Sequence, residues 1–177
     1  MSKKSKKFGA FGESVDGIEF AVFNERAIRA AAGLLFLFGF TAWMLALTTD
    51  NYQPLRAFGM TFMIDMYLRL FVSTKWVPSL VIANWIVRPQ RPEWVDAAPK
   101  KFAWSLGLGM VITSCLAMGM FAMTGPLPLL LCAGCIFFLF IEAAFGICIG
   151  CEISRRFSKN KPRLCPGDVC NYTPGAK

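Results

Sequence analysis

The sequence predicts an all-α membrane protein with four transmembrane helices, and three observations lead to that prediction. Hydrophobic residues make up 55% of the chain and charged residues only 17%, whereas about 25% of an ordinary soluble domain is charged. The apolar residues fall in long continuous runs, without the alternation of a transmembrane β-strand. The basic residues that give the chain its net charge of +8 collect beside these runs rather than within them.

Four apolar runs are each long enough to cross a hydrocarbon layer of about 30 Å at about 1.5 Å per residue. They cover residues 30–47, 55–72, 102–123 and 127–151. Asn24, Glu25 and Arg26 precede the first run and are typical of a helix N-cap. Residues 76–87 are also apolar but too few to cross, so they predict a short interfacial helix between spans 2 and 3.

Lysine and arginine positions set the expected orientation of the spans. Seventeen of the 19 basic residues lie before the first run, between the second and third runs, or near and beyond the end of the fourth. Four spans place these three segments on one side, so both termini are expected to be cytoplasmic. The predicted organisation is a basic N-terminal tail at 1–29, a four-helix membrane domain at 30–151 and a cysteine-containing cytoplasmic tail at 152–177.

The distribution of charge also limits the class of function. No basic stripe interleaved with aromatic residues is present, so we expect the lipid bilayer, and not nucleic acid, as a partner. The chain has no histidine. It therefore lacks the commonest general base and the usual axial ligand of haem.

Three ionisable residues lie inside the predicted spans, where charges are costly and usually paired. Asp65 and Arg69 are four residues apart, the spacing of an ion pair on one helix face. Counted from the outer ends of their spans, Arg69 and Glu142 lie at a similar depth of about 21–22 Å. We therefore expect Arg69 to bridge Asp65 and Glu142, as a lock on helix packing or as part of a proton or anion path.

All seven cysteines lie in the last 63 residues of the chain, and four of them follow the pattern C-x2-C-x13-C-x4-C on the predicted cytoplasmic side: Cys148, Cys151, Cys165 and Cys170. Four thiolates at this spacing suit a zinc ion or an iron–sulfur centre. In a reducing cytoplasm, metal binding or redox exchange is favoured over permanent disulfides. The neighbouring arginines and lysines favour reactive thiolates. The alternative is a tail of unliganded thiols.

A second sulfur group lies inside the predicted spans and comprises Cys115, Cys132 and Cys135, with Met60, Met63, Met66 and Met118 nearby. Soft sulfur ligands suit Cu(I), although methionine at helical spacing is usually packing material. The two C-x2-C pairs of the fourth span face opposite ways, so Cys132 and Cys135 are not expected to form one site with Cys148 and Cys151. A relay between the two groups would then require a partner or a bound small molecule.

Several short motifs, taken together, resemble one bacterial family. They are residues 24–26 (Asn-Glu-Arg), 65–69, 98–103 (Ala-Pro-Lys-Lys-Phe-Ala), 146–151 (Gly-Ile-Cys-Ile-Gly-Cys) and 165–170 (Cys-Pro-Gly-Asp-Val-Cys). The combination is similar to the membrane proteins registered as domain-of-unknown-function family 4395, over about residues 20–170. The resemblance implies a four-helix protein of the bacterial cytoplasmic (inner) membrane. Members of this family are encoded near thioredoxin-like proteins and sulfurtransferases. The resemblance therefore implies sulfur or thiol handling, with a protein of one of these two kinds as partner.

Three functions follow as hypotheses. The first is thiol redox chemistry or sulfur handling at a cytoplasmic-face cluster of Cys148, Cys151, Cys165 and Cys170. The second is a non-catalytic accessory subunit, which docks a larger membrane complex through small interfaces such as the Gly146–Gly150 pair and holds a structural metal on the same four cysteines. The third is a carrier of Cu(I) or of a small sulfur compound that uses Cys115, Cys132 and Cys135.

Overall fold

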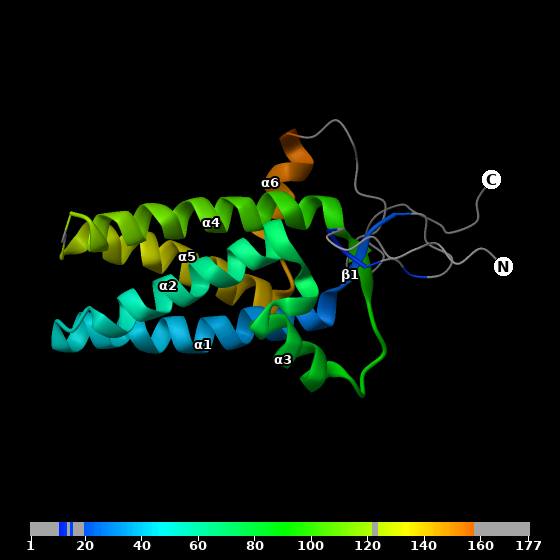
Figure 1. Cartoon of the computed structure of the whole chain (residues 1–177), viewed down its shortest axis with the longest axis horizontal. Helices are drawn as coiled ribbons and strands as arrows, with labels where there is room; N and C mark the ends of the chain where they lie inside the picture. The colour runs from blue at the N-terminus through cyan, green and yellow to red at the C-terminus, as the bar shows by residue number, and fades with distance from the viewer. Residues whose placement is uncertain (1–10, 14, 16–19, 122–123, 158–177) are drawn as a thin grey trace.

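The computed structural model describes residues 11–13, 15, 20–121 and 124–157. Four long helical segments lie side by side (Figure 1). They are α1 (Glu25–Thr49), α2 (Gln53–Tyr67) with its π-helical continuation η1 (Leu68–Val72), α4 (Ala97–Gly119) and α5 (Pro126–Phe145). The 3-10 turn η2 (Thr74–Trp76) leads into α3 (Pro78–Val87), which packs on α1, and α6 (Ile149–Phe157) packs on α4.

Local sequence signals account for the helix boundaries that position the site. Asn24 caps α1, because its side-chain oxygen accepts a hydrogen bond from the backbone N–H of Arg26 at 3.2 Å, as the N-cap sequence predicted. Asp96 caps α4 in the same way and accepts from the N–H of Ala98 at 3.0 Å. α5 ends at Gly146, whose φ of 68° is a left-handed conformation that glycine adopts without steric penalty.

The end of α5 differs from the predicted fourth span, which continued to Cys151. Gly146 stops the helix, and the chain turns before α6 begins at Ile149. The prediction that Cys148 faces away from Cys135 assumed one continuous helix. Because α5 and α6 are separate helices, that angular argument does not apply.

Two short antiparallel strands, which the sequence analysis did not anticipate, join the starts of α1 and α4. They are β1 (Val22–Asn24) and β2 (Trp94–Asp96), with Val22 opposite Asp96, Phe23 opposite Val95 and Asn24 opposite Trp94. Each strand runs directly into a helix. The pairing therefore brings the start of α4 near the start of α1, with the two helices leaving opposite ends of the strand pair.

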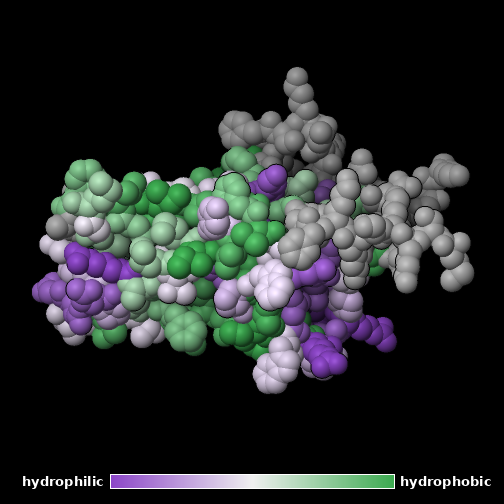
Figure 2. Space-filling view, viewed as in Figure 1, coloured by the Kyte–Doolittle hydropathy of each residue, from purple (hydrophilic) through white to green (hydrophobic). Residues whose placement is uncertain are grey.

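Apolar side chains cover the outside of the bundle as well as its interior. Figure 2 shows hydrophobic residues over the helical body and hydrophilic residues gathered toward its ends. Among the most exposed, at 64–75%, are Phe38, Phe71, Met120, Phe121 and Leu130. Soluble proteins rarely expose so much apolar surface. The structure is thus mostly helical and suits a lipid bilayer, with three described helices long and apolar enough to cross it: α1, α4 and α5.

The close approach of α1 to α2 generates a first prediction. A Cβ placed on Gly39 would lie 2.7 Å from the ring of Phe58, whereas a Cβ on Gly109 of α4 would meet nothing within 4 Å. We expect Gly39→Ala to lower the free energy of unfolding by about 1–3 kcal/mol through overpacking. Gly109→Ala should raise it by up to about 1 kcal/mol, because alanine is the better helix former.

Thermal unfolding in detergent micelles, followed by circular dichroism, measures both variants. Equal effects of the two substitutions would contradict the contact between Gly39 and Phe58.

Candidate functional site

A buried ion pair of α2 and η1 is the first part of the candidate site. The Nε of Arg69 donates to Oδ2 of Asp65 at 2.8 Å, as the four-residue spacing predicted. Ser79 of α3 completes the group: its hydroxyl donates to Oδ1 of Asp65 at 2.6 Å and accepts from Nη2 of Arg69 at 2.8 Å. The guanidinium carbon lies 5.0 Å from the ring centroid of Trp104 on α4. All four side chains are buried, so this group links α2, η1, α3 and α4.

A second buried group, the lysine triad, consists of Lys100 between Glu25 and Glu142. The Nζ of Lys100 lies 3.2 Å from Oε1 and 2.9 Å from Oε2 of Glu25, and 2.8 Å from Oε1 of Glu142. The strand pair explains the meeting, because Glu25 directly follows β1 and Lys100 lies in the first turn of α4 after β2. The triad joins α1, α4 and α5.

The lysine triad corrects the predicted partner of Glu142. Among the described residues, Glu142 pairs with Lys100, and Arg69 is held by the first group instead of bridging to Glu142. The depth estimate treated Lys100 as part of a cytoplasmic loop before the third span. Since α4 begins at Ala97, Lys100 is instead a helical residue that faces the interior.

Cys148 and Cys151 form a disulfide at the N-terminal end of α6. Cys148 directly precedes Ile149, the first residue of the helix, and its Sγ accepts a hydrogen bond from the backbone N–H of Cys151 at 3.3 Å. This is the position of an N-cap, where unpaired N–H groups and the helix dipole favour negative charge. When the pair is reduced, the same position favours the thiolate of Cys148 over its thiol.

Two glycines place this pair against the bundle. Gly150 lets α6 approach α4, because a Cβ there would lie 2.6 Å from Ala103. The turn at Gly146 lies against the guanidinium of Arg29, which also donates to two carbonyl groups in the last turn of α5, at 3.4 and 3.2 Å. Both glycines thus lie against other parts of this chain. The accessory-subunit hypothesis stays a prediction.

One partly open cavity is lined by Cys148 and by residues of both charged groups. It lies among α1, α2, α4, α5 and the start of α6, and its walls include Arg69, Trp104, Cys135, Glu142 and Cys148. The volume of about 60 Å³ is room for several water molecules, since one requires about 10–15 Å³ on this measure. Cys135 and Cys148, predicted to face opposite sides, line the same cavity.

The remaining cysteines have less polar surroundings. Cys132 lies 3.1 Å from the hydroxyl of Ser114, measured from Sγ to Oγ. It shares a second, smaller apolar cavity with Cys135, and Cys115 is a free thiol of α4. Within the described ranges, no three cysteine, aspartate or glutamate side chains are grouped so that they could hold a metal ion. The hypothesis of a Cu(I) or small-sulfur-compound carrier stays a prediction.

The predicted four-thiolate centre lies only partly within the described residues. The structure brings Cys148 and Cys151 together. Cys165 and Cys170 lie outside the described residues.

Sequence reasoning missed four members of the site: Glu25, Ser79, Lys100 and Trp104. Glu25 was read only as part of the N-cap sequence, and an acidic residue in a first turn is normally explained by the helix dipole. Lys100 was counted as a membrane-flanking charge. Asp96 was the available signal in the sequence. As an N-cap residue it indicates a helix that begins before the apolar run, and such a helix includes Lys100.

Comparison with known proteins identifies a family without assigning a function. The family model described as a domain of unknown function, DUF4395, matches residues 23–159, so the chain belongs to that family. The match includes both buried charged groups and the Cys148–Cys151 pair. Neither the curated proteins nor the solved structures give a match.

The lysine triad generates a second prediction. Lys100→Met leaves Glu25 and Glu142 buried without a cation and should cost about 3–5 kcal/mol of unfolding free energy. Adding Glu142→Gln should recover part of that loss, so the two substitutions should be strongly coupled in a double-mutant cycle.

The matched control is the cycle of Arg69→Ala with Glu142→Gln. Arg69 and Glu142 form no ion pair with each other in the described structure but line the same cavity, so their coupling should be weaker than that of Lys100 with Glu142. Denaturant unfolding in micelles measures both cycles. Additive effects of Lys100→Met and Glu142→Gln would argue against the triad.

Proposed function

We propose that this member of the DUF4395 family is a membrane thiol–disulfide exchange protein whose redox pair is Cys148 and Cys151. The observation that carries the proposal is the position of the pair: two cysteines within bonding reach at the N-terminal end of α6, with Cys148 on the wall of a partly open cavity. A disulfide with only structural use would need neither the helix N-terminus nor the cavity. An exchange pair benefits from both, since the first stabilises the attacking thiolate.

The two cysteines take different roles under this proposal. Cys148 is the attacking thiol, because its sulfur receives the N–H of Cys151 and lies on the cavity wall. Cys151 lies one helical turn further along and is the resolving thiol. Its sulfur reaches Cys148 without any change in the helix.

The exchange transfers two electrons. In the reduced protein, the thiolate of Cys148 attacks one sulfur of a partner's disulfide. A mixed disulfide forms, the partner's own S–S bond breaks, and its second sulfur leaves as a thiolate that takes up a proton. Cys151 then loses its proton and attacks the sulfur of Cys148, which forms the internal disulfide and releases the first partner sulfur. The partner class is a dithiol protein of the thioredoxin-like type, and a reduced partner drives the reverse sequence.

The proposal places the bundle in the bacterial cytoplasmic membrane with four spans and both termini on the cytoplasmic side. α2 and η1 together have 20 residues, about 30 Å of helix, which matches the hydrocarbon layer. Their charged residues Asp65 and Arg69 are paired and buried, which lowers the cost of placing them at that depth. The exposed rings of Trp76 and Trp85 suit a membrane interface for η2 and α3.

The assignment of roles generates a third prediction, tested with oxidised glutathione on the reduced, purified protein. Cys151→Ser should accumulate a glutathione adduct on Cys148, because this variant lacks the proposed resolving thiol. The wild type should proceed to the internal disulfide. Cys148→Ser should react through Cys151 roughly fivefold more slowly, the factor expected from loss of the helix N-terminal position.

Mass spectrometry of the intact protein and of its peptides measures these products. Cys132→Ser is the matched control and should behave as the wild type. A wild-type adduct on Cys148 that persists as long as in Cys151→Ser would contradict the exchange function.

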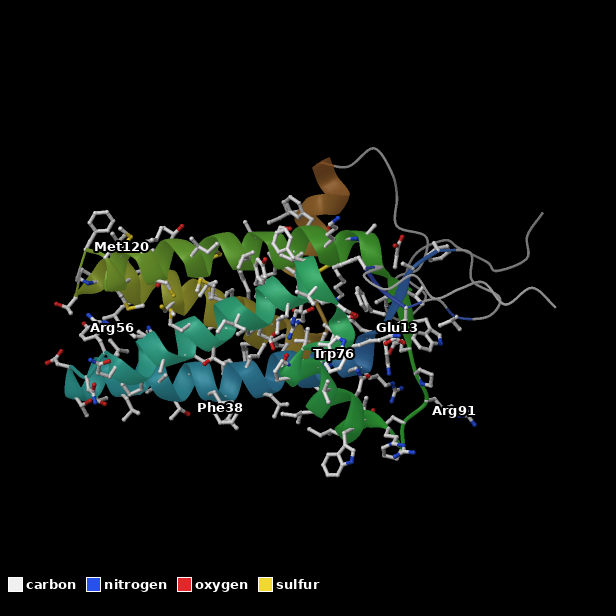
Figure 3. All side chains as sticks on the ribbon, viewed as in Figure 1. Glu13, Phe38, Arg56, Trp76, Arg91 and Met120 are labelled. Carbon is white, nitrogen blue, oxygen red and sulfur yellow. A yellow bond between two sulfur atoms is a disulfide. The ribbon has the colours of Figure 1, made fainter. Side chains whose placement is uncertain are left out.

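The topology generates a fourth prediction. Arg91, in the connector after α3, lies at the end of the bundle opposite Arg56 and Met120 (Figure 3), and both Arg91 and Asn51 are exposed. In intact bacterial cells, a membrane-impermeant thiol reagent should label Asn51→Cys but not Arg91→Cys, each in a background without the native cysteines. Both should react after permeabilisation. External labelling of Arg91→Cys would eliminate the four-span orientation.

A further inference from the structure

The lysine triad carries unequal charge. Two carboxylates, Glu25 and Glu142, face the single ammonium group of Lys100. The neighbouring group of Asp65 and Arg69 is balanced one to one and supplies no spare cation. An uncompensated charge away from water is costly. Uptake of one proton by the triad relieves that cost, so the triad has the composition of a buried proton acceptor.

The two carboxylates differ in their access. Both oxygens of Glu25 lie within 3.2 Å of Nζ of Lys100, and the residue is 1% exposed and does not line the cavity. Glu142 offers only Oε1 to Lys100 and does line the cavity. Within the described residues, its Oε2 has no hydrogen-bond partner. The accessible carboxylate of the triad is therefore that of Glu142.

The same cavity reaches Cys148, and its other titratable or charged lining residues are Arg69 and Cys135. Arg69 donates hydrogen bonds to Asp65 and Ser79. Around the cavity, Arg29 of α1 donates to carbonyls at the end of α5, and Lys101 of α4 lies over the ring of Phe11. Glu152 on α6 has interactions of its own. Among the described residues, Glu142 is thus the carboxylate that lines the same cavity as Cys148.

We propose that Glu142 is the proton acceptor for Cys148 in the exchange reaction, an inference that rests on the proposed function. As the reduced Cys148 ionises to the attacking thiolate, its S–H bond breaks and its proton passes through a cavity water to Oε2 of Glu142. The thiolate then forms a bond to one sulfur of the partner's disulfide, the partner's S–S bond breaks, and the second partner sulfur leaves as a thiolate. In the reverse direction Glu142 returns the proton to the leaving sulfur of Cys148. Lys100 and Glu25 act as positioning residues. They hold the carboxylate of Glu142 in place and set the charge beside it, without contacting the reacting sulfur.

The test measures the rate at which iodoacetamide alkylates Cys148 as a function of pH, in the full-length Cys151→Ser protein in micelles. Alkylation follows the thiolate fraction, and a thiol coupled to a carboxyl group titrates in two steps. We expect two steps in this background and loss of one step when Glu142→Gln is added. Cys135→Ser, the other titratable group of the cavity, should keep both steps.

Two further variants separate a proton-transfer role from a structural one. Glu142→Asp retains a carboxylate and should keep two steps. Glu25→Gln should also keep them, displaced along the pH axis because Lys100 then faces a single carboxylate. A single-step profile in the Cys151→Ser protein itself overturns the proposal whether or not Glu142→Gln folds, and so does a two-step profile that survives Glu142→Gln.

Failure of this inference is distinguishable from failure of the proposed function. Alkylation requires no partner, so the two measurements are independent. If the alkylation profile has two steps but the protein does not exchange with oxidised glutathione, the coupling of Glu142 with Cys148 stands and the exchange function is refuted. If the protein exchanges but the alkylation profile has one step, the exchange function stands and the role of Glu142 is refuted.

Discussion

The ammonium group of Lys100 is the point on which the arrangement of the candidate site depends. Removing one cation and two carboxylates from water costs several kcal/mol per ion, and only close and well-directed contacts offset that cost. The contacts of 2.8–3.2 Å to Glu25 and Glu142 meet that condition. They tolerate little displacement of α1, α4 or α5. The orientation of the end of α5, and with it the turn that delivers Cys148, follows from this constraint.

The group of Asp65, Arg69 and Ser79 restrains other helices of the bundle in the same way, through close contacts between buried charged and polar side chains. It ties η1 to α3, and the ring of Trp104 continues the contact to α4. In a lipid environment apolar side chains gain little by choosing one helix neighbour over another. Buried charged groups of this kind can specify which helices are neighbours, and here two of them cover all four long helical segments.

The sequence predicted the helical class, the apolar runs and the ion pair of Asp65 with Arg69, because these depend on local composition and on i,i+4 spacing. It did not predict the strand pair of β1 and β2, since three-residue strands leave almost no periodic signal. The partner of Glu142 was missed because it depends on where α4 begins, and element ends are the least certain part of a sequence reading. The cavity shared by Cys135 and Cys148 was missed because one glycine, Gly146, separates two helices that composition alone joins.

The strand pair also has a consequence for the order of assembly. β1 and β2 are adjacent in space but separated along the chain by α1, α2 and α3. Closing so large a loop has an entropic cost, and contacts between distant segments form late. During synthesis Glu25 is therefore made long before Lys100, and the lysine triad can form only after α4 has been made. The cavity beside it is complete later still, because its walls also include residues of α5 and the start of α6.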